Sequence, residues 1–401
     1  MPTDLESRLV RHLRKLCVDI GPRPIGSPGN HAAAGYIQEV FQAAGLEVET
    51  QRFGCPAWED GGTSLALDGE PVEAAANAFS PPCDVTAPGV SVGTVAGLEA
   101  ADLAGRVGIL YGELTQSPLS PKSWFLKSER EDHIIRLLEE KNPAALVTVQ
   151  PRMGDLERVI VDWEFRIPSA TVPARAGLAI LCRHNPTLHL RIQSRSGPGH
   201  TCNVVARKEG ESQARIVLCA HYDTTIDTPG ALDNAAGVAA LLALAQVLSQ
   251  RQLTHGLEWI VFSGHEYLPL GDDEYLRRCG DGLEGIIVAI NFDAVGQYLA
   301  ANSMAMFASS AAFQERVVEI SREYPGLAWV APWPESNHST FAMRGVPAIA
   351  FSSAGRIRLD HLRADSVEWV SPARLKEVVA LVMKIVEDVQ DKSPDWTRPA
   401  S

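Results

Sequence analysis

The stretch ARIVLCAHYDTTIDTPGALDNAAG, residues 214–237, decides the fold. Its first part, residues 215–220, is an apolar run typical of a buried strand, and His221 and Asp223 follow the end of that strand. A loop marked by Gly and Pro leads to Asp233, where an Ala- and Leu-rich helix is expected over residues 233–250. Zinc binds imidazole and carboxylate groups that further residues orient, so this segment is a candidate part of a metal site.

The same alternation of strand and helix continues through the C-terminal half. Further helices are expected at residues 274–279, 311–324 and 372–390. Apolar runs predict strands at residues 188–194, 203–207, 215–220, 257–263, 285–292 and 346–352. This order predicts an α/β fold with a mixed, mostly parallel central sheet and helices on both faces.

The middle of the chain differs in character. From residue 56 to residue 186 it is rich in Gly, Pro and short β-like runs, which predicts an inserted β-rich domain. The catalytic domain would then be discontinuous, comprising residues 1–55 and 187–391, and the polar residues 392–401 are expected to be a flexible tail. The insert would cover or shape a cleft, or serve as a purely structural element.

Composition narrows the class of protein. The chain has 401 residues and a formal net charge of −13, which argues against nonspecific binding of nucleic acid. The charged N-terminal segment lacks the apolar core of a signal peptide, and we expect no apolar run of membrane-spanning length. Seven scattered cysteines without a CxxC pair favour reduced thiols. We therefore expect a cytoplasmic protein without a membrane partner, and its oligomeric state stays open.

Ligand-type residues follow several of the predicted strands. In open α/β sheets, ligands bind beyond the carboxyl ends of the strands, so these residues are expected to converge on one edge. They are His221, Asp233, Glu266, Asp293 and His361. Their number and type predict two divalent ions that share one carboxylate and leave room for a bridging water. Zinc fits this set of nitrogen and oxygen ligands, and Mn²⁺ or Co²⁺ remain open.

Several longer motifs carry a family resemblance. In chain order they are GPRPIGSPGN (21–30), HYD (221–223), GALDNAAG (230–237), SGHEYLPLGDDEYL (263–276), NFDAVG (291–296), SNHSTF (336–341) and DHLRADS (360–366). With these motifs the chain resembles the di-zinc aminopeptidases, a family of zinc exopeptidases that also includes glutaminyl cyclases and glutamate carboxypeptidases. The insert resembles a protease-associated domain.

The resemblance implies a role for each matching residue. Asp233 would bridge the two ions, with His221 and Asp293 on one ion and Glu266 and His361 on the other. Asp223 would orient His221. The resemblance places two more residues around the ligands rather than on the metal, namely His338 and Asp365.

The chain also departs from the family. Family peptidases carry two adjacent glutamates, the first acting as general base, whereas this chain has His265 before Glu266. The family's Ser-Asp-His reads Ser-Asn-His here, so Asn337 replaces an acid near the base. Asp360 stands where the family often has an aromatic residue, and we expect it to restore some negative charge for a substrate ammonium.

His265 allows three interpretations: a general base in place of the glutamate, an additional or replacement metal ligand, or a sign of lost activity.

The leading hypothesis for the function of the protein is a metal-dependent hydrolase of amide bonds, either an aminopeptidase or a hydrolase of small peptides or amino-acid amides. A metal-bridging hydroxide would be its nucleophile, and His265 would handle protons. The alternatives are an acyltransferase resembling the single-zinc glutaminyl cyclases and a noncatalytic scaffold. The side-chain preference and the need for a free N-terminus stay open.

Overall fold

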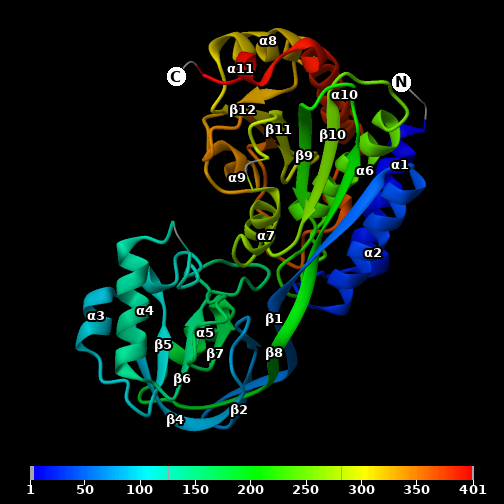
Figure 1. The fold of residues 1–401 in the computed structure, drawn as a ribbon. Coiled ribbons are helices and arrows are strands. Elements are labelled where there is room, and N and C mark those ends of the chain that lie inside the picture. The colour runs from blue at the N-terminus through cyan, green and yellow to red at the C-terminus, as the bar shows by residue number, and fades with distance from the viewer. Residues whose placement is uncertain (1–3, 125, 281, 400–401) are drawn as a thin grey trace. The chain divides into compact units, whose positions relative to one another are not determined.

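The computed structural model describes residues 4–124, 126–280 and 282–399 (Figure 1). The chain forms two compact units, one of residues Met1–Cys55 and His200–Ser401 and the other of residues Pro56–Gly199. Two long strands carry the chain between the units, β1 (Glu47–Leu67) and β8 (Thr187–Lys208). The second unit therefore begins at the expected residue 56 but ends at residue 199 instead of 186, because β8 continues across the expected boundary.

The first unit is built on a mixed sheet with the strand order β13-β12-β14-β11-β9-β10-β8. Its central strands are β9 (Arg215–His221), β10 (Gly256–Phe262), β11 (Ile286–Phe292) and β14 (Ala348–Ala354), which pair in parallel. β12 (Ala301–Phe307) and β8 run antiparallel to their central neighbours, and the short β13 (Ala328–Trp329) pairs in parallel with β12. The predicted mixed, mostly parallel sheet is confirmed.

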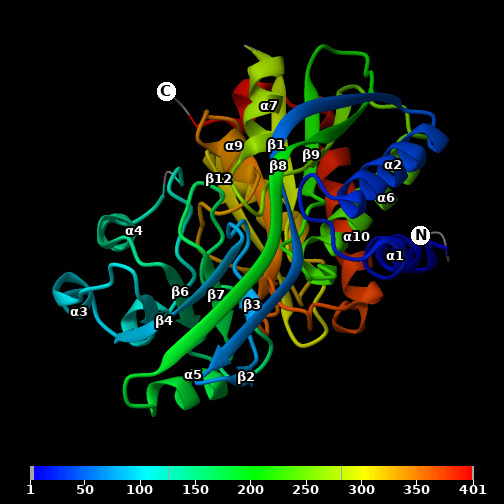
Figure 2. The ribbon, with the colours of Figure 1, turned by 90° about the horizontal axis from the view of Figure 1, so that it is seen from below.

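Helices cover both faces of this sheet. Figures 1 and 2 show helices gathered on one side, namely α1 (Leu5–Arg14), α2 (Pro28–Ala43), α6 (Ala236–Leu248) and α10 (Pro372–Asp388). α8 (Ala311–Ser321) contributes to the same hydrophobic core. On the other face, α7 (Leu270–Cys279) and α9 (His338–Ala342) pack Tyr275 and Phe341 into a second core. Burial of apolar side chains on both faces explains why the central strands read as continuous apolar runs.

α6 is the central helix of the first unit. Together with the turn before it, it gives an 18-residue stretch, Ala231–Leu248, that is long and apolar enough to cross a membrane by length and composition alone. The sequence-based expectation overlooked this stretch. However, 83% of it is buried inside the protein, and it packs against α1, α2 and α10. A helix that is apolar all round is also what the core of a large unit requires.

The second unit has its own sheet and its own cores. β4 (Cys83–Val92), β5 (Val107–Leu110), β6 (Ala145–Val149) and β7 (Ser169–Val172) pair in parallel. β3 (Ala75–Ala76) closes one edge antiparallel to β7, and β2 (Glu70–Val72) pairs with β1. Three helices accompany them, α3 (Val95–Ala100), α4 (Glu129–Lys141) and α5 (Ala174–Leu181). The unit is thus an α/β layer structure and not solely the β-rich domain expected, because its fully buried parallel strands need helical cover.

The chain end is ordered up to residue 399, contrary to the expected flexible tail. α11 (Pro394–Thr397) packs against β11 within the first unit, where the Thr397 hydroxyl donates a 2.7 Å hydrogen bond to the carbonyl of Ile287. The ring of Trp396 lies 5.8 Å from that of Phe313, measured between centroids. Residues 400 and 401 of the expected tail lie outside the described residues.

Candidate metal centre

The carboxyl ends of four parallel strands meet at one edge of the first unit. His221 ends β9 and pairs with the last residue of β10, while Phe292 at the end of β11 pairs with Phe351 of β14. Asp293 directly follows β11, Glu266 lies in the turn after β10, and His361 lies in the loop after β14. Asp233 comes from the segment Ala231–Ala235 between β9 and α6, where its own backbone is not helical (φ −117°, ψ 84°). The sheet therefore brings all five candidate ligands to one place.

The distances between these side chains define two groups. His221 Nε2 lies 3.2 Å from Asp233 Oδ1 and 3.7 Å from Asp293 Oδ1. His361 Nε2 lies 3.6 Å from Asp233 Oδ2 and 3.0 Å from Glu266 Oε2. The two oxygens of Asp233 thus face different histidines, each of which has a further carboxylate beside it. This is the arrangement of a carboxylate that bridges two cations.

The residues at this edge fit divalent metal. His221 Nε2 is buried and makes no hydrogen bond within the described parts of the chain, although ligand-type oxygens surround it. Burial works to lower the pKa of His361, but Glu266, Asp233 and Asp360 together raise it to about 10. Burial and the nearby Asp233 raise the pKa of Glu266 to about 7. Both shifts reflect a cluster of carboxylates, which favours the binding of a cation, and its nitrogen and oxygen donors suit zinc.

Asp223 supports the ligands without joining the two groups. Its carboxylate accepts hydrogen bonds from the backbone N–H of His265 at 3.2 Å and of Glu266 at 3.1 Å. Its Oδ1 also lies 3.7 Å from His221 Nδ1. The carboxylate of Asp223 therefore positions the turn that carries Glu266, while its backbone carbonyl oxygen lies 3.3 Å from His221 Nδ1 and can orient that ring.

Two more buried residues hold the loop that carries Asp233. Asp365 accepts hydrogen bonds from the backbone N–H of Leu232 at 2.8 Å and of Asp233 at 3.0 Å. The guanidinium of Arg23 is fully buried and donates to the carbonyls of Tyr222 and Pro229, at 2.7 and 2.8 Å. Sequence reasoning placed Asp365 near the site but missed Arg23. The signal was available in the motif GPRPIGSPGN, which had no assigned role.

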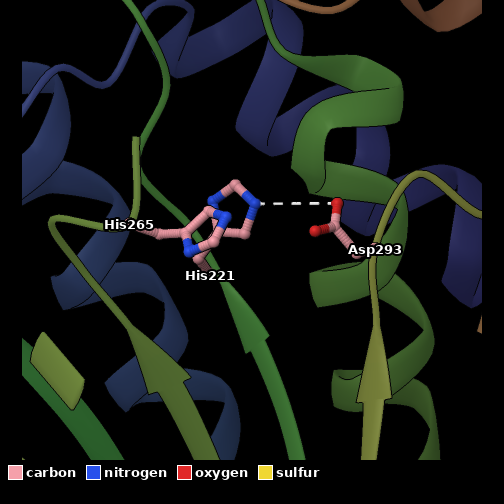
Figure 3. A group of neighbouring side chains, drawn as sticks. All are labelled: His221, His265 and Asp293. Atoms are coloured by element: carbon pink, nitrogen blue, oxygen red, sulfur yellow. Dashed lines mark ion pairs between the residues drawn. The ribbon is translucent and has the colours of Figure 1, made fainter. Parts of the chain in front are cut away.

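His265 lies against the first group of ligands. Its ring packs on that of His221 with 4.2 Å between centroids and an interplanar angle of 36° (Figure 3). One ring nitrogen of His265, one ring nitrogen of His221 and one carboxylate oxygen of Asp293 lie within 4.8 Å of one another. Burial, assisted by His221, lowers the pKa of His265 to about 4, so its imidazole is neutral near pH 7. The geometry is compatible with a base and with a ligand.

Asn337 and His338 are each engaged by other residues of the first unit. The Asn337 amide donates to both carboxylate oxygens of Asp272, at 3.0 and 2.9 Å. His338 Nε2 lies 2.7 Å from the carbonyl oxygen of Trp333, and its ring packs on Phe307. Sequence reasoning missed Asp272. This buried carboxylate means that the region around residue 337 keeps an acid, whereas the sequence suggested that the acid had been lost.

Asp360 does not play the part expected of it. Its carboxylate lies 2.5 Å from Arg356 Nη1 and 4.0 Å from Arg358 Nε. Only 10% of its side chain is exposed. Asp360 is therefore engaged by arginine instead of presenting a free negative charge to a substrate ammonium.

Comparison with known proteins supports the fold and the family. Residues 203–386 match the sequence model of peptidase family M28. The chain is 26% identical over 306 residues to the probable lipoprotein aminopeptidase LpqL of Mycobacterium tuberculosis, covering 71% of this chain and 58% of that protein. It is 24% identical over 290 residues to the aminopeptidase YwaD of Bacillus subtilis, covering 71% and 60%. The chain thus spans less than two thirds of the length of these relatives.

Solved structures share the architecture. The zinc aminopeptidase BSAP from Bacillus subtilis superposes with a TM-score of 0.80 at 20% identity, covering 96% of this chain and 94% of that one. A glutaminyl cyclase from Fimbriiglobus ruber superposes with a TM-score of 0.53 at 14% identity, covering 96% of each chain. At these identities the likeness shows a shared fold.

Proposed function

We propose that this protein is a zinc-dependent hydrolase of amide bonds, because residues 203–386 match the sequence model of peptidase family M28. Its substrates would be small peptides or amino-acid amides, as for an aminopeptidase. The observation that carries the proposal is the pair of groups around Asp233, whose two oxygens lie 3.2 and 3.6 Å from His221 and His361. A noncatalytic scaffold would have no need for two such groups.

Zinc ions held by the two groups would activate water as the nucleophile and polarise the amide carbonyl. Asp233 would be shared, with His221 and Asp293 on one side and Glu266 and His361 on the other. Asp223, Asp365 and Arg23 hold these side chains or their backbone in place through the hydrogen bonds described above. Mn²⁺ and Co²⁺ also accept this donor set, so the proposal covers them as replacements.

We propose His265 as the proton carrier of the reaction. It would take a proton from the attacking water and deliver it to the leaving amine, as the family's glutamate does. Two observations support this role. Its ring lies beside His221, and burial keeps the imidazole neutral and therefore able to accept a proton at neutral pH.

The experiment is a substrate panel with defined metal. Aminoacyl amides, N-blocked amides and a glutaminyl peptide are incubated with protein loaded with Zn²⁺, Mn²⁺ or Co²⁺, with Asp233→Asn as the control that removes the shared carboxylate. We expect hydrolysis by the wild type and a loss of at least about a hundredfold in Asp233→Asn. Cyclisation of the glutaminyl peptide without hydrolysis would point to an acyltransferase. No turnover by fully loaded protein would point to a scaffold.

A further inference from the structure

The loop that carries His361 borders the candidate metal centre, and we call this loop its rim. The rim holds arginine instead of a free carboxylate. The loop RIRLDH, residues 356–361, carries Arg356 and Arg358 just before Asp360 and His361. Arg356 neutralises Asp360 at 2.5 Å. Arg358 approaches the same carboxylate only to 4.0 Å, which is too long for a hydrogen bond. One positive charge at this rim therefore has no carboxylate of its own.

From this we propose that the site takes amide substrates that carry a carboxylate close to the scissile bond, and that Arg358 binds this carboxylate. The inference rests on the proposed hydrolase function and specifies its substrate class. The Arg358 side chain is 67% exposed, and within the described parts of the chain it makes no hydrogen bond. An exposed guanidinium without a hydrogen-bond partner offers a planar pair of N–H donors, which matches the geometry of a carboxylate.

The backbone beside Arg358 is held in place. The side-chain amide of Gln297 donates a 2.8 Å hydrogen bond to the carbonyl of Ile357, and its oxygen accepts one of 2.7 Å from the Ile357 N–H. Gln297 lies four residues after Asp293, in the segment that follows β11. The loop of Arg358 is thus tied to the segment of one candidate ligand and itself carries another, His361. A loop fixed in this way reduces the entropy that Arg358 would lose when it binds a ligand.

The positions that could recognise a substrate ammonium do not offer a free carboxylate. Position 265 is a histidine, Asn337 is turned to Asp272, and Asp360 is paired with Arg356. The carboxylates of the two ligand groups would be neutralised by bound metal. A substrate anion near the scissile bond would therefore be favoured over a substrate cation at this rim.

The test compares substrates that share one scissile bond. They are the p-nitroanilides of leucine, acetyl-leucine and succinyl-leucine, together with that of glutamate. The variant is Arg358→Gln. The matched control is Arg363→Gln, because Arg363 lies two residues after this loop, is similarly exposed at 69%, and is already paired with Asp227 at 2.9 Å.

We expect the wild type to prefer succinyl-leucine over acetyl-leucine, or glutamate over leucine, by about tenfold in kcat/KM. Arg358→Gln should remove that preference mainly through KM, whereas Arg363→Gln should keep it. If wild type and Arg358→Gln both cleave the leucine substrate best and equally well, the inference is wrong while the hydrolase function stands.

A binding measurement decides the case if no substrate is turned over. Glutarate is titrated into zinc-loaded protein by calorimetry. We expect its Kd to rise about tenfold in Arg358→Gln and to stay unchanged in Arg363→Gln. Glutarate that fails to bind the wild type, or that binds Arg358→Gln equally well, would overturn the inference. Failure of the hydrolase proposal would show separately, as absent turnover of every substrate by loaded protein.

Discussion

At the scale of single residues, Asp272 and Asn337 behave as a matched pair. Asn337→Asp would place two buried carboxylates about 3 Å apart, so we expect it to lower the free energy of unfolding by about 1–3 kcal/mol at pH 7. The double variant Asp272→Asn/Asn337→Asp restores one acid and one amide, and it should recover most of the loss. Urea unfolding of the three proteins measures this. Equal stability of Asn337→Asp and wild type would contradict the pairing.

Asp272 also gives a pH dependence with a defined sign. Burial raises its pKa from 3.8 to about 6, so the folded protein binds this proton more tightly than the unfolded chain. Its contribution to stability therefore falls as the pH rises from about 4 to 6. Asp272 accepts hydrogen bonds from the Asn337 amide and from the Thr340 hydroxyl. Asp272→Asn can keep both through its amide oxygen and should lack this decline. The check is the difference in unfolding free energy between wild type and variant across that pH range. A constant difference would rule out the shift.

His265 can be assigned by separating turnover from metal content. As a proton carrier it should be worth about a hundredfold to ten-thousandfold in kcat, so His265→Ala should lose that factor while its zinc content stays unchanged. His265→Glu, which restores the family's base, should regain part of the activity. Unchanged turnover in His265→Ala would exclude the role. A loss of bound zinc would instead make His265 a ligand.

Some residues of the site can be predicted from sequence and others cannot. The five candidate ligands follow predicted strands whose ends must meet, so their convergence was predictable. Arg23 and Asp272 act through burial and through contacts with segments more than 60 residues away, for which no local pattern exists. Asp360 was misjudged because its partner Arg356 becomes its neighbour only through the fold of the loop.

At the scale of elements, the loop between β9 and α6 depends on one glycine. Gly230 has a φ of +60°, and an added Cβ would lie 2.3 Å from Thr224 Cγ2 and 2.6 Å from the carbonyl oxygen of Asp233. We expect Gly230→Ala to destabilise the protein by about 1–3 kcal/mol and to weaken zinc binding. Gly35→Ala is the control, since its Cβ in α2 meets nothing within 4 Å, and it should stabilise by about 0.5–1 kcal/mol. Thermal unfolding with and without zinc compares them, and equal effects would refute the steric argument.

The long strand β8 shows where pattern reading stops at this scale. Two short strands were predicted at residues 188–194 and 203–207, separated by a polar stretch with Gly and Pro that is typical of a turn. The structure continues the strand from Thr187 to Lys208. Pairing with β1 holds the intervening residues extended, and that partner lies more than a hundred residues earlier in the chain. Tertiary pairing therefore overrides local propensity here.

At the scale of the whole molecule, the sequence predicts the division into two units better than the character of the second. The change in composition at residue 56 coincides with the start of that unit. Its helices α3 and α5 were not expected, because short amphipathic segments among Gly and Pro give weak periodicity. The order at the C-terminus was also missed, since its polar composition hides the contacts of Trp396 and Thr397.

Metal content per chain tests the central claim most directly, because both ligand groups belong to one chain and share Asp233. Protein saturated with zinc and then dialysed is analysed by mass spectrometry for metal and by calorimetry for affinity. The controls are Asp293→Asn and His361→Ala, each of which removes a ligand from one group only. The account predicts two zinc ions per wild-type chain, and one in each variant. A single ion or none in the wild type, or two ions in both variants, would contradict it.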